Sequence, residues 1–282
     1  MKHFKKKSVQ KMIKAGIFAT ALGGCVIAKG NIQDVHAEDY KLRLNSNNEW
    51  QYYGDDNQVD TDYTGLALNE YGWWYVENGV INTEYKGLAE NDYGWWYVEN
   101  GVINFNYDGI AKNEYGLWYV KKGVIDFSYT GVQSYKGDKL YVKSGLVQDN
   151  FTGLIKYNSD LLYVEDGRLQ EDYTGVAQYS GDKYYVNAGK VDTKYTGLVK
   201  DSNDKVYVEK GKVNTTYTGF IEDKDDTVYL ENGKVESDFT GLMNYNKDIL
   251  YIEDGYVNKS YKGLFNQNDT YYYIKSGKVD TT

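Results

Sequence analysis

The sequence predicts an all-β protein, an elongated β-solenoid of ten 22-residue β-hairpin repeats with a degenerate N-terminal half-repeat. Two observations lead to this fold class. A glycine recurs at one constant interval, without insertion or deletion, from Gly65 through Gly87 to Gly263. A second glycine keeps the same interval from Gly79 to Gly277. A fixed period of this length is the sequence signature of a repeat architecture, so residues 65–282 are predicted to be tandem repeats.

Residues 1–37 are predicted to be a secretory signal peptide. Lysines precede an apolar run over residues 15–28, which is too short to span a membrane. A small-x-small pattern at Val35-His36-Ala37 marks a cleavage site. Two alternatives stay open. In the first, residues 1–37 are an N-terminal membrane anchor. In the second, Leu22-Gly23-Gly24-Cys25 is a lipoprotein signal in which Cys25 is lipidated.

Cleavage after Ala37 would leave a strongly acidic chain without cysteine or histidine. It would carry 25 basic and 40 acidic residues, a net charge of −15. Such a surface repels nucleic acid and anionic membranes. Without cysteine, neither disulfides nor a cysteine metal site can stabilise the fold. We therefore expect secretion, with retention at the bacterial surface or wall, and no nucleic-acid partner.

Residues 38–64 are predicted to be an N-terminal cap formed by a degenerate repeat. Tyr53, Val59 and Tyr63 each precede a repeat residue by one full period, namely Tyr75, Ile81 and Tyr85. A stacked array needs a terminal unit that covers the first regular repeat.

Each regular repeat is predicted to form two or three strands of about four residues. Counting from the first glycine, position +1 is apolar, +10 is tyrosine, +11 and +16 are aliphatic and +20 is aromatic, as in Leu66, Tyr75, Val76, Ile81 and Tyr85. These constant positions are the predicted core. Between them lie turn formers, including Asn-Gly and Asp-Gly, which favour tight hairpins. Each repeat has few large side chains for its length, so a single repeat must stack on its neighbours to fold.

The candidate binding residues are aromatic and cluster in the first three repeats. Position +9 is always apolar, so its tryptophans are predicted to be mainly core. Position +8 accepts lysine in three later repeats and must therefore reach solvent, which makes Trp73 and Trp95 candidate exposed platforms. The alternative is that they pack on Tyr71, Tyr93 and the next hairpin. The full set of candidates is Trp73, Trp95, Tyr71, Tyr93, Trp74, Trp96 and Trp118.

No catalytic or metal site is predicted. Both histidines, His3 and His36, lie in the predicted signal peptide, and the carboxylates lie on turns without a predicted pocket. The Asp- and Asn-rich turns follow no calcium-loop pattern. We therefore expect a protein that is not an enzyme and has no cofactor.

The repeat resembles the bacterial cell-wall-binding repeats of the choline-binding and glucan-binding type. The matching segments are Gly72–Gly79, Gly94–Gly101 and, less closely, Gly116–Val120. The resemblance implies a hairpin solenoid that binds wall polymers or glycans non-covalently. In the choline-binding version a tryptophan follows the opening glycine, whereas this chain has aliphatic residues such as Leu66 and Leu88. A glycan-stacking surface is therefore favoured over a choline cage, although a choline-bearing polymer stays open.

The predicted function is that of an exported, non-catalytic surface protein. It would bind a cell-wall polymer or another glycan through its tandem aromatic hairpins. The alternative is a structural or adhesive surface rod that binds a host or bacterial protein.

Overall fold

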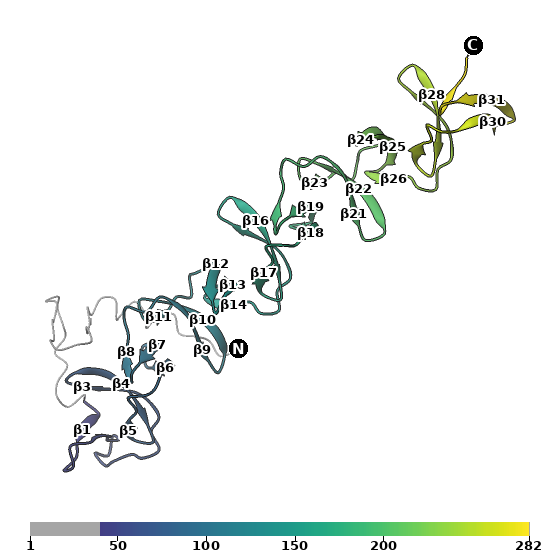
Figure 1. Ribbon diagram of the computed structural model, residues 1–282. Coiled ribbons are helices and arrows are strands. Elements are labelled where there is room, and N and C mark those ends of the chain that lie inside the picture. Colours follow the sequence, from purple (N-terminus) through teal and green to yellow (C-terminus); the bar gives the residue numbers. More distant parts are fainter. Residues whose placement is uncertain (1–39, 282) are drawn as a thin grey trace. The chain divides into compact units, whose positions relative to one another are not determined.

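The computed structural model describes residues 40–281, which form β-strands joined by turns (Figure 1). The predicted signal peptide, with Cys25 and both histidines, lies outside the described residues. The chain divides into two compact units. Unit 1 comprises the described residues up to Asn150 together with Asp166–Arg168. Unit 2 comprises Phe151–Glu165 and the described residues from Leu169 onward.

From Gly65 onward the strands come in groups of three, which confirms the predicted all-β class. Each group usually has strands of five, six and two residues. The described strands are β1 (Leu42–Leu44), β2 (Trp50–Tyr52), β3 (Gly65–Asn69), β4 (Gly72–Glu77), β5 (Val80–Ile81), β6 (Gly87–Asn91), β7 (Gly94–Glu99), β8 (Val102–Ile103), β9 (Gly109–Asn113), β10 (Gly116–Lys121), β11 (Val124–Ile125), β12 (Gly131–Tyr135), β13 (Asp138–Lys143), β14 (Leu146–Val147), β15 (Gly153–Tyr157), β16 (Asp160–Glu165), β17 (Arg168–Leu169), β18 (Gly175–Tyr179), β19 (Asp182–Asn187), β20 (Lys190–Val191), β21 (Gly197–Asp201), β22 (Asp204–Glu209), β23 (Lys212–Val213), β24 (Gly219–Asp223), β25 (Asp226–Glu231), β26 (Lys234–Val235), β27 (Gly241–Tyr245), β28 (Asp248–Glu253), β29 (Tyr256–Val257), β30 (Lys262–Gln267), β31 (Thr270–Lys275) and β32 (Lys278–Val279).

Backbone pairing links the strands within a repeat and then joins the repeat to the next one. In the first regular repeat, β3 and β4 are antiparallel, with Leu66 opposite Tyr75. Strand β5 folds back on β4. The amide of Tyr75 also donates a 2.8 Å hydrogen bond to the carbonyl of Gly101 in the following repeat. The second strand of one repeat thus pairs with the third strand region of the next.

The turn before each third strand has two successive residues with positive φ. Asn100 has φ 54° and Gly101 has φ 73°. A Cβ on Gly101 would lie 2.4 Å from the carbonyl oxygen of Asn82, so only glycine fits there. Lys122 and Ala188 take the same left-handed conformation as Asn100, with φ values of 50° and 49°. The hairpin therefore imposes its turn even where the sequence lacks asparagine.

The core lies both within repeats and between neighbouring ones. The aliphatic residue at position +11 is fully buried in every regular repeat, from Val76 to Ile274. Leu66 is covered by Ala89, Trp96 and Val98 from the following repeat. This arrangement explains why one repeat cannot fold alone: the next repeat supplies the apolar surface that buries position +1.

The invariant tyrosine has a structural role within its own repeat. Tyr75 stacks on Tyr85 with ring centroids 3.5 Å apart. The Tyr85 hydroxyl donates a 2.8 Å hydrogen bond to the carbonyl of Leu88. Burial of this hydroxyl raises the pKa of Tyr85 to about 12.

The N-terminal hairpin uses a different register from the one predicted. Tyr52, not Tyr53, stacks on Tyr63, with ring centroids 3.6 Å apart, and its amide donates to the carbonyl of Gly79. The predicted equivalence of Tyr53 and Tyr75 is therefore wrong by one residue. The regular repeat interval is not kept across this hairpin, because Leu42 rather than Leu44 pairs with Tyr52. Tyr53 instead lies beneath the guanidinium of Arg43, 5.1 Å from its ring centroid.

Candidate functional site

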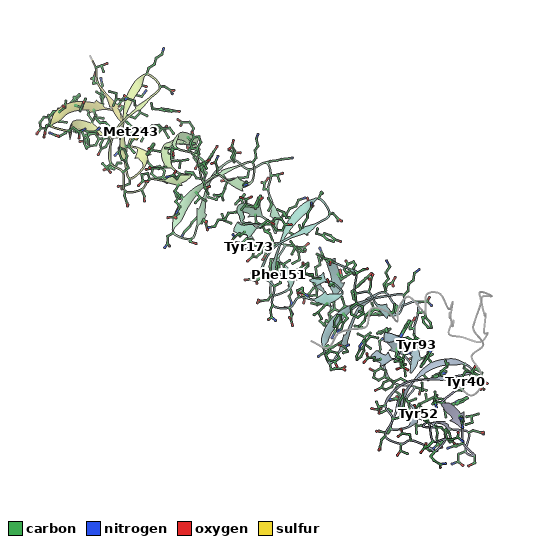
Figure 2. All side chains as sticks on the ribbon, turned by 180° about the vertical axis from the view of Figure 1, so that it is seen from behind. Tyr40, Tyr52, Tyr93, Phe151, Tyr173 and Met243 are labelled. Atoms are coloured by element: carbon green, nitrogen blue, oxygen red, sulfur yellow. The ribbon has the colours of Figure 1, made fainter. Side chains whose placement is uncertain are left out.

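Three tyrosines are exposed at the turns of the first three regular hairpins. Tyr71, Tyr93 and Tyr115 occupy position +6 in the turns between β3 and β4, β6 and β7, and β9 and β10. Their exposed fractions are 65%, 39% and 60%; Figure 2 labels Tyr93. Glycine or a polar residue replaces tyrosine at this position in every later repeat. Exposed rings of this kind are therefore specific to the first three repeats.

Each of these tyrosines contacts a tryptophan from the preceding repeat. The contacts are Trp50–Tyr71, Trp73–Tyr93 and Trp95–Tyr115, which we name the Trp–Tyr pairs. Their ring centroids lie 6.0, 5.9 and 5.9 Å apart, in T-shaped geometry. Edge-to-face contacts are the favoured arrangement of aromatic pairs. Each exposed tyrosine is therefore held in place by a tryptophan of the neighbouring repeat.

The structure corrects the expected roles of Trp73 and Trp95. Trp95 is only 7% exposed, so its prediction as an exposed platform is wrong, and Trp73 is partly buried. Position +8 faces the next repeat. In unit 2 the Lys183 ammonium at this position reaches Asp201 of the next repeat at 2.6 Å. A lysine stem can run along such an interface and leave its charge at the rim, whereas an indole is covered there.

The tryptophans at position +9 are held by asparagines of the same hairpin. The indole N–H groups of Trp74, Trp96 and Trp118 donate to the Oδ1 atoms of Asn69, Asn91 and Asn113, at 3.0, 3.0 and 2.8 Å. Trp96 and Trp118 are each 7% exposed, which confirms their prediction as core residues, and Trp74 is partly buried. Each Oδ1 atom also accepts the amide of the exposed tyrosine, as Asn113 does from Tyr115 at 2.9 Å.

Through these hydrogen bonds, the asparagine at position +4 positions the other side chains of the site. One oxygen fixes both the buried indole and the turn that presents the exposed tyrosine. Tyr71 and Tyr93 are predicted from the sequence, whereas Tyr115 and the three asparagines are not. The sequence does contain a pattern that could have identified them. Asparagine at position +4, tyrosine at +6 and tryptophan at +9 occur together in the first three regular repeats alone.

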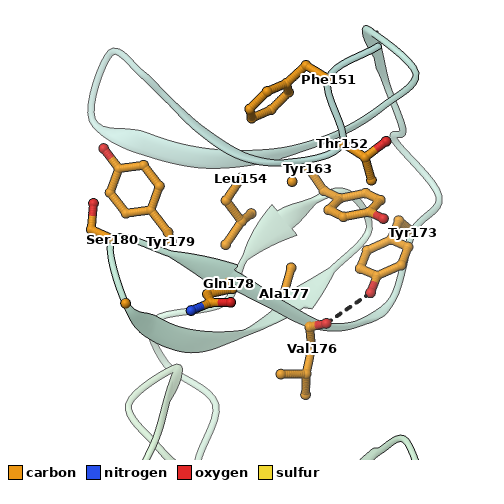
Figure 3. A pocket seen from close by; sticks show the side chains of 12 residues that line it. Phe151, Thr152, Leu154, Tyr163, Tyr173, Val176, Ala177, Gln178, Tyr179 and Ser180 are labelled. Carbon is orange, nitrogen blue, oxygen red and sulfur yellow. Dashed lines mark hydrogen bonds between the residues drawn. The ribbon is translucent and has the colours of Figure 1, made fainter.

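Unit 2 contains a pocket that is not predicted from the sequence. Its volume is about 510 Å³, and its lining includes Phe151, Leu154, Tyr163, Tyr173 and Tyr179. Figure 3 shows Tyr163 beside Tyr173, and Phe151 and Tyr179 near Leu154. The Tyr163 and Tyr173 rings stack at 3.7 Å, and the Tyr173 hydroxyl donates to the carbonyl of Val176. Burial raises the pKa of Tyr173, and none of the residues that line the pocket is charged.

Two further findings concern the described residues. Residues 40–281 contain no group of three or more histidine, cysteine, aspartate or glutamate residues that could hold a metal ion. In the same range, no helix is long and apolar enough to cross a membrane.

Comparison with known protein families shows which family this chain belongs to. The choline-binding repeat model matches seven segments, which together cover more than half of the sequence: residues 62–82, 84–104, 106–126, 172–192, 194–214, 216–236 and 260–280. The chain therefore belongs to the choline-binding repeat family, which confirms the resemblance noted from its sequence. No curated protein matches the chain.

Solved structures with similar repeats include two different proteins. Choline binding protein F from Streptococcus pneumoniae is 19% identical with a TM-score of 0.31, over 83% of this chain and 76% of that one. Alternansucrase in complex with isomaltononaose is 16% identical with a TM-score of 0.27, over 86% of this chain. The present chain spans only 18% of the length of that alternansucrase.

Proposed function

We propose that this chain is an exported, non-catalytic binding protein that attaches to a cell-wall polymer or another glycan at the bacterial surface. The observation that carries the proposal is the set of Trp–Tyr pairs. Each offers an exposed tyrosine ring that is held edge-on by a tryptophan of the preceding repeat. A fixed, exposed aromatic face provides a stacking surface for a sugar ring at low entropic cost. Membership of the choline-binding repeat family supports a ligand of the carbohydrate or choline-related kind.

Repetition of the Trp–Tyr pair raises the strength of attachment. A single exposed ring provides weak binding. A polymer that engages two or three such rings binds with a high effective concentration at the second and third contacts. The acidic chain, with a formal net charge of −9 over its whole length, favours a neutral or cationic polymer over an anionic one.

A cell-wall pull-down tests this function. The variant Tyr71→Ala/Tyr93→Ala/Tyr115→Ala is expected to lose most binding to purified cell walls, and soluble glucans are expected to compete with the wild-type chain. Tyr271→Ala is the matched control, because Tyr271 is 70% exposed and lies outside the Trp–Tyr pairs. Unchanged retention of the triple variant would exclude this mechanism. Binding that survives excess sugar and choline, but disappears when the acidic residues are neutralised, would favour a protein partner instead.

The unit 2 pocket favours a second candidate ligand, a choline-type quaternary ammonium group. Its lining includes the rings of Phe151, Tyr163, Tyr173 and Tyr179, and quaternary ammonium ions bind to aromatic faces. Choline chloride should then bind the wild-type chain, and Tyr179→Ala should weaken that binding without changing retention by glucan. Equal choline binding by wild type and Tyr179→Ala would remove this candidate.

A further inference from the structure

The first three regular repeats contain buried hydrogen-bond donors that have no acceptor. Among the described residues, five buried side-chain nitrogens lack a partner: Asn69 Nδ2, Trp73 Nε1, Asn91 Nδ2, Trp95 Nε1 and Asn113 Nδ2. Trp95 is 7% exposed and Asn113 is 9% exposed. Buried donors are nearly always paired in native proteins, so a repeated set of unpaired ones requires an explanation.

These donors gather around the exposed tyrosines. Tyr115 contacts the Trp95 ring, and its amide is bonded to Asn113. Tyr93 stands in the same relation to Trp73 and Asn91, since its amide donates to Asn91 Oδ1 at 3.0 Å. Two consecutive repeats thus each contribute one contact of the exposed tyrosine from a residue whose side chain has an unpaired donor.

Unit 2 shows what these two positions do when they are paired. Lys183 and Asp201 occupy positions +8 and +4 of consecutive repeats, as Trp95 and Asn113 do in unit 1. The Lys183 ammonium bonds the Asp201 carboxylate at 2.6 Å. At this interface of unit 2 a donor meets an acceptor, whereas in unit 1 the same two positions carry side-chain N–H groups that both lack an acceptor. The component absent from unit 1 is an acceptor.

The chemistry of that acceptor restricts the ligand. Indole and amide N–H groups bond to an oxygen with free lone pairs, such as a sugar hydroxyl or an amide carbonyl. A quaternary ammonium group has no lone pair and cannot pair with them. An anionic oxygen is disfavoured by the acidic character of the chain. An uncharged sugar meets all three conditions.

We propose that Trp95, Asn113 and Tyr115, and likewise Trp73, Asn91 and Tyr93, form two sites selective for an uncharged sugar and unable to select choline. The sugar stacks on the tyrosine ring, and a small shift of that ring lets sugar oxygens accept from the indole and amide N–H groups beside it. This inference rests on the proposed function and names its ligand class.

The test removes the donors and keeps the rings. In the full chain, Trp73→Phe/Trp95→Phe is expected to bind dextran or chitin oligosaccharides about tenfold more weakly by titration calorimetry, one lost hydrogen bond to the ligand being worth about a factor of ten. Choline chloride binding is expected to be unchanged. Lys183→Met, at the same repeat position in unit 2, is the matched control and should leave sugar affinity unchanged.

A stability measurement supplies a readout that does not depend on the ligand. Without sugar, Trp95→Phe should lower the Tm less than Trp96→Phe does. Both indoles are 7% exposed and both changes leave a similar cavity, but only the Trp96 indole loses a hydrogen bond, the one to Asn91. An equal fall in both variants would mean that the Trp95 donor already has a partner, and would overturn the inference.

The binding outcomes separate the two proposals. If Trp73→Phe/Trp95→Phe binds sugar as tightly as wild type while the triple tyrosine variant does not bind, the donor inference fails and the proposed function stands. If the wild-type chain binds choline chloride but neither dextran nor chitin oligosaccharides, the sugar-selective sites are refuted, and glycan binding is refuted with them.

Discussion

Residues 65–130 and residues 131–281 use one backbone plan with two different interfaces between repeats. Both regions keep the glycine turn and the fully buried aliphatic residue at position +11. They differ where one repeat meets the next. Between consecutive repeats the first region has the Trp–Tyr contacts, whereas the second has a recurring set of ion pairs beside aromatic contacts such as Phe220–Tyr245.

Five ion pairs of the second region recur with one fixed spacing. An aspartate at position +7 faces a base at position +15 of the next repeat: Asp138–Arg168, Asp160–Lys190, Asp182–Lys212, Asp204–Lys234 and Asp248–Lys278. In the first region the same two positions carry glycine and an apolar residue, as in Gly72 and Val102. The comparison teaches that the glycines and the buried aliphatic side chains specify the repeat, which leaves the interface chemistry free to become a binding surface.

The largest expected effect tests what the two regions share. Gly101→Ala in the first region and Gly211→Ala in the second should each destabilise the surrounding repeats by about 3 kcal/mol or more. Each combines a positive φ with a Cβ at 2.4 or 2.6 Å from a backbone oxygen. Hydrogen exchange of the neighbouring strands measures the loss.

A glycine without the steric clash is the control for this pair. Gly137 has φ +96°, but a Cβ on it would meet nothing within 4 Å. Gly137→Ala should cost only the conformational strain, about 1 kcal/mol. Equal losses at Gly137 and Gly101 would show that the close backbone approach contributes nothing.

The second prediction targets a bond that only the first region has. Asn113→Ala removes the Oδ1 atom that accepts hydrogen bonds from the Trp118 indole and the Tyr115 amide. We expect a loss of about 2 kcal/mol, since each lost hydrogen bond costs about 1 kcal/mol. Asp223→Ala is the control at the same position in the second region, where the backbone bond from Leu198 is long at 3.3 Å. A larger loss for Asp223→Ala would reverse the comparison.

The third prediction concerns alkaline pH. Burial raises the pKa of Tyr63 and Tyr85 to about 12, above the ordinary value of 10.0. The folded state therefore favours the neutral phenol. Its contribution to stability is complete below pH 10 and is lost as the pH rises toward 12. Absorbance titration of the tyrosines together with stability between pH 9 and 12 measures this loss.

Tyr85→Phe removes the hydroxyl group of Tyr85 and keeps the aromatic ring. It removes the bond to the Leu88 carbonyl and should cost about 1 kcal/mol at pH 7. It should also reduce the alkaline loss of stability. Phenylalanine occurs naturally at this repeat position in Phe151 and Phe239, so the fold tolerates the change. An undiminished alkaline loss in Tyr85→Phe would contradict the assignment.

The smallest effect distinguishes the ion pairs of the second region. The pKa values of Lys212 and Lys234 are raised, first by their hydrogen bonds to Asp182 and Asp204. Lys212→Met/Lys234→Met should lower the Tm slightly at low salt and not at about 1 M salt, because exposed pairs are weak and screened. Val102→Met, at the matching position of the first region, should show no salt dependence. Salt-dependent loss in Val102→Met would remove the distinction.

The repeat pattern predicted the local structure well, because its determinants lie within one repeat. The interval, the hairpins, the glycine turn and the buried position +11 all depend on residues close in sequence. The burial of Trp96 and Trp118 was also predictable from the sequence, since position +9 is apolar in every repeat. The burial of Trp95 could not be predicted in this way. A lysine at the same repeat position, +8, reaches solvent with its ammonium group, whereas an indole there is covered.

The sequence by itself determined the period, the all-β class and the residues that bury each hairpin. Only the tertiary structure decided which side chains of consecutive repeats meet. It brought Trp95 against Tyr115, paired Lys183 with Asp201, and formed the pocket around Leu154. The physical reason is that the repeated sequence pattern reflects contacts within one repeat. Contacts between repeats depend on how the backbone hydrogen bonds orient successive hairpins.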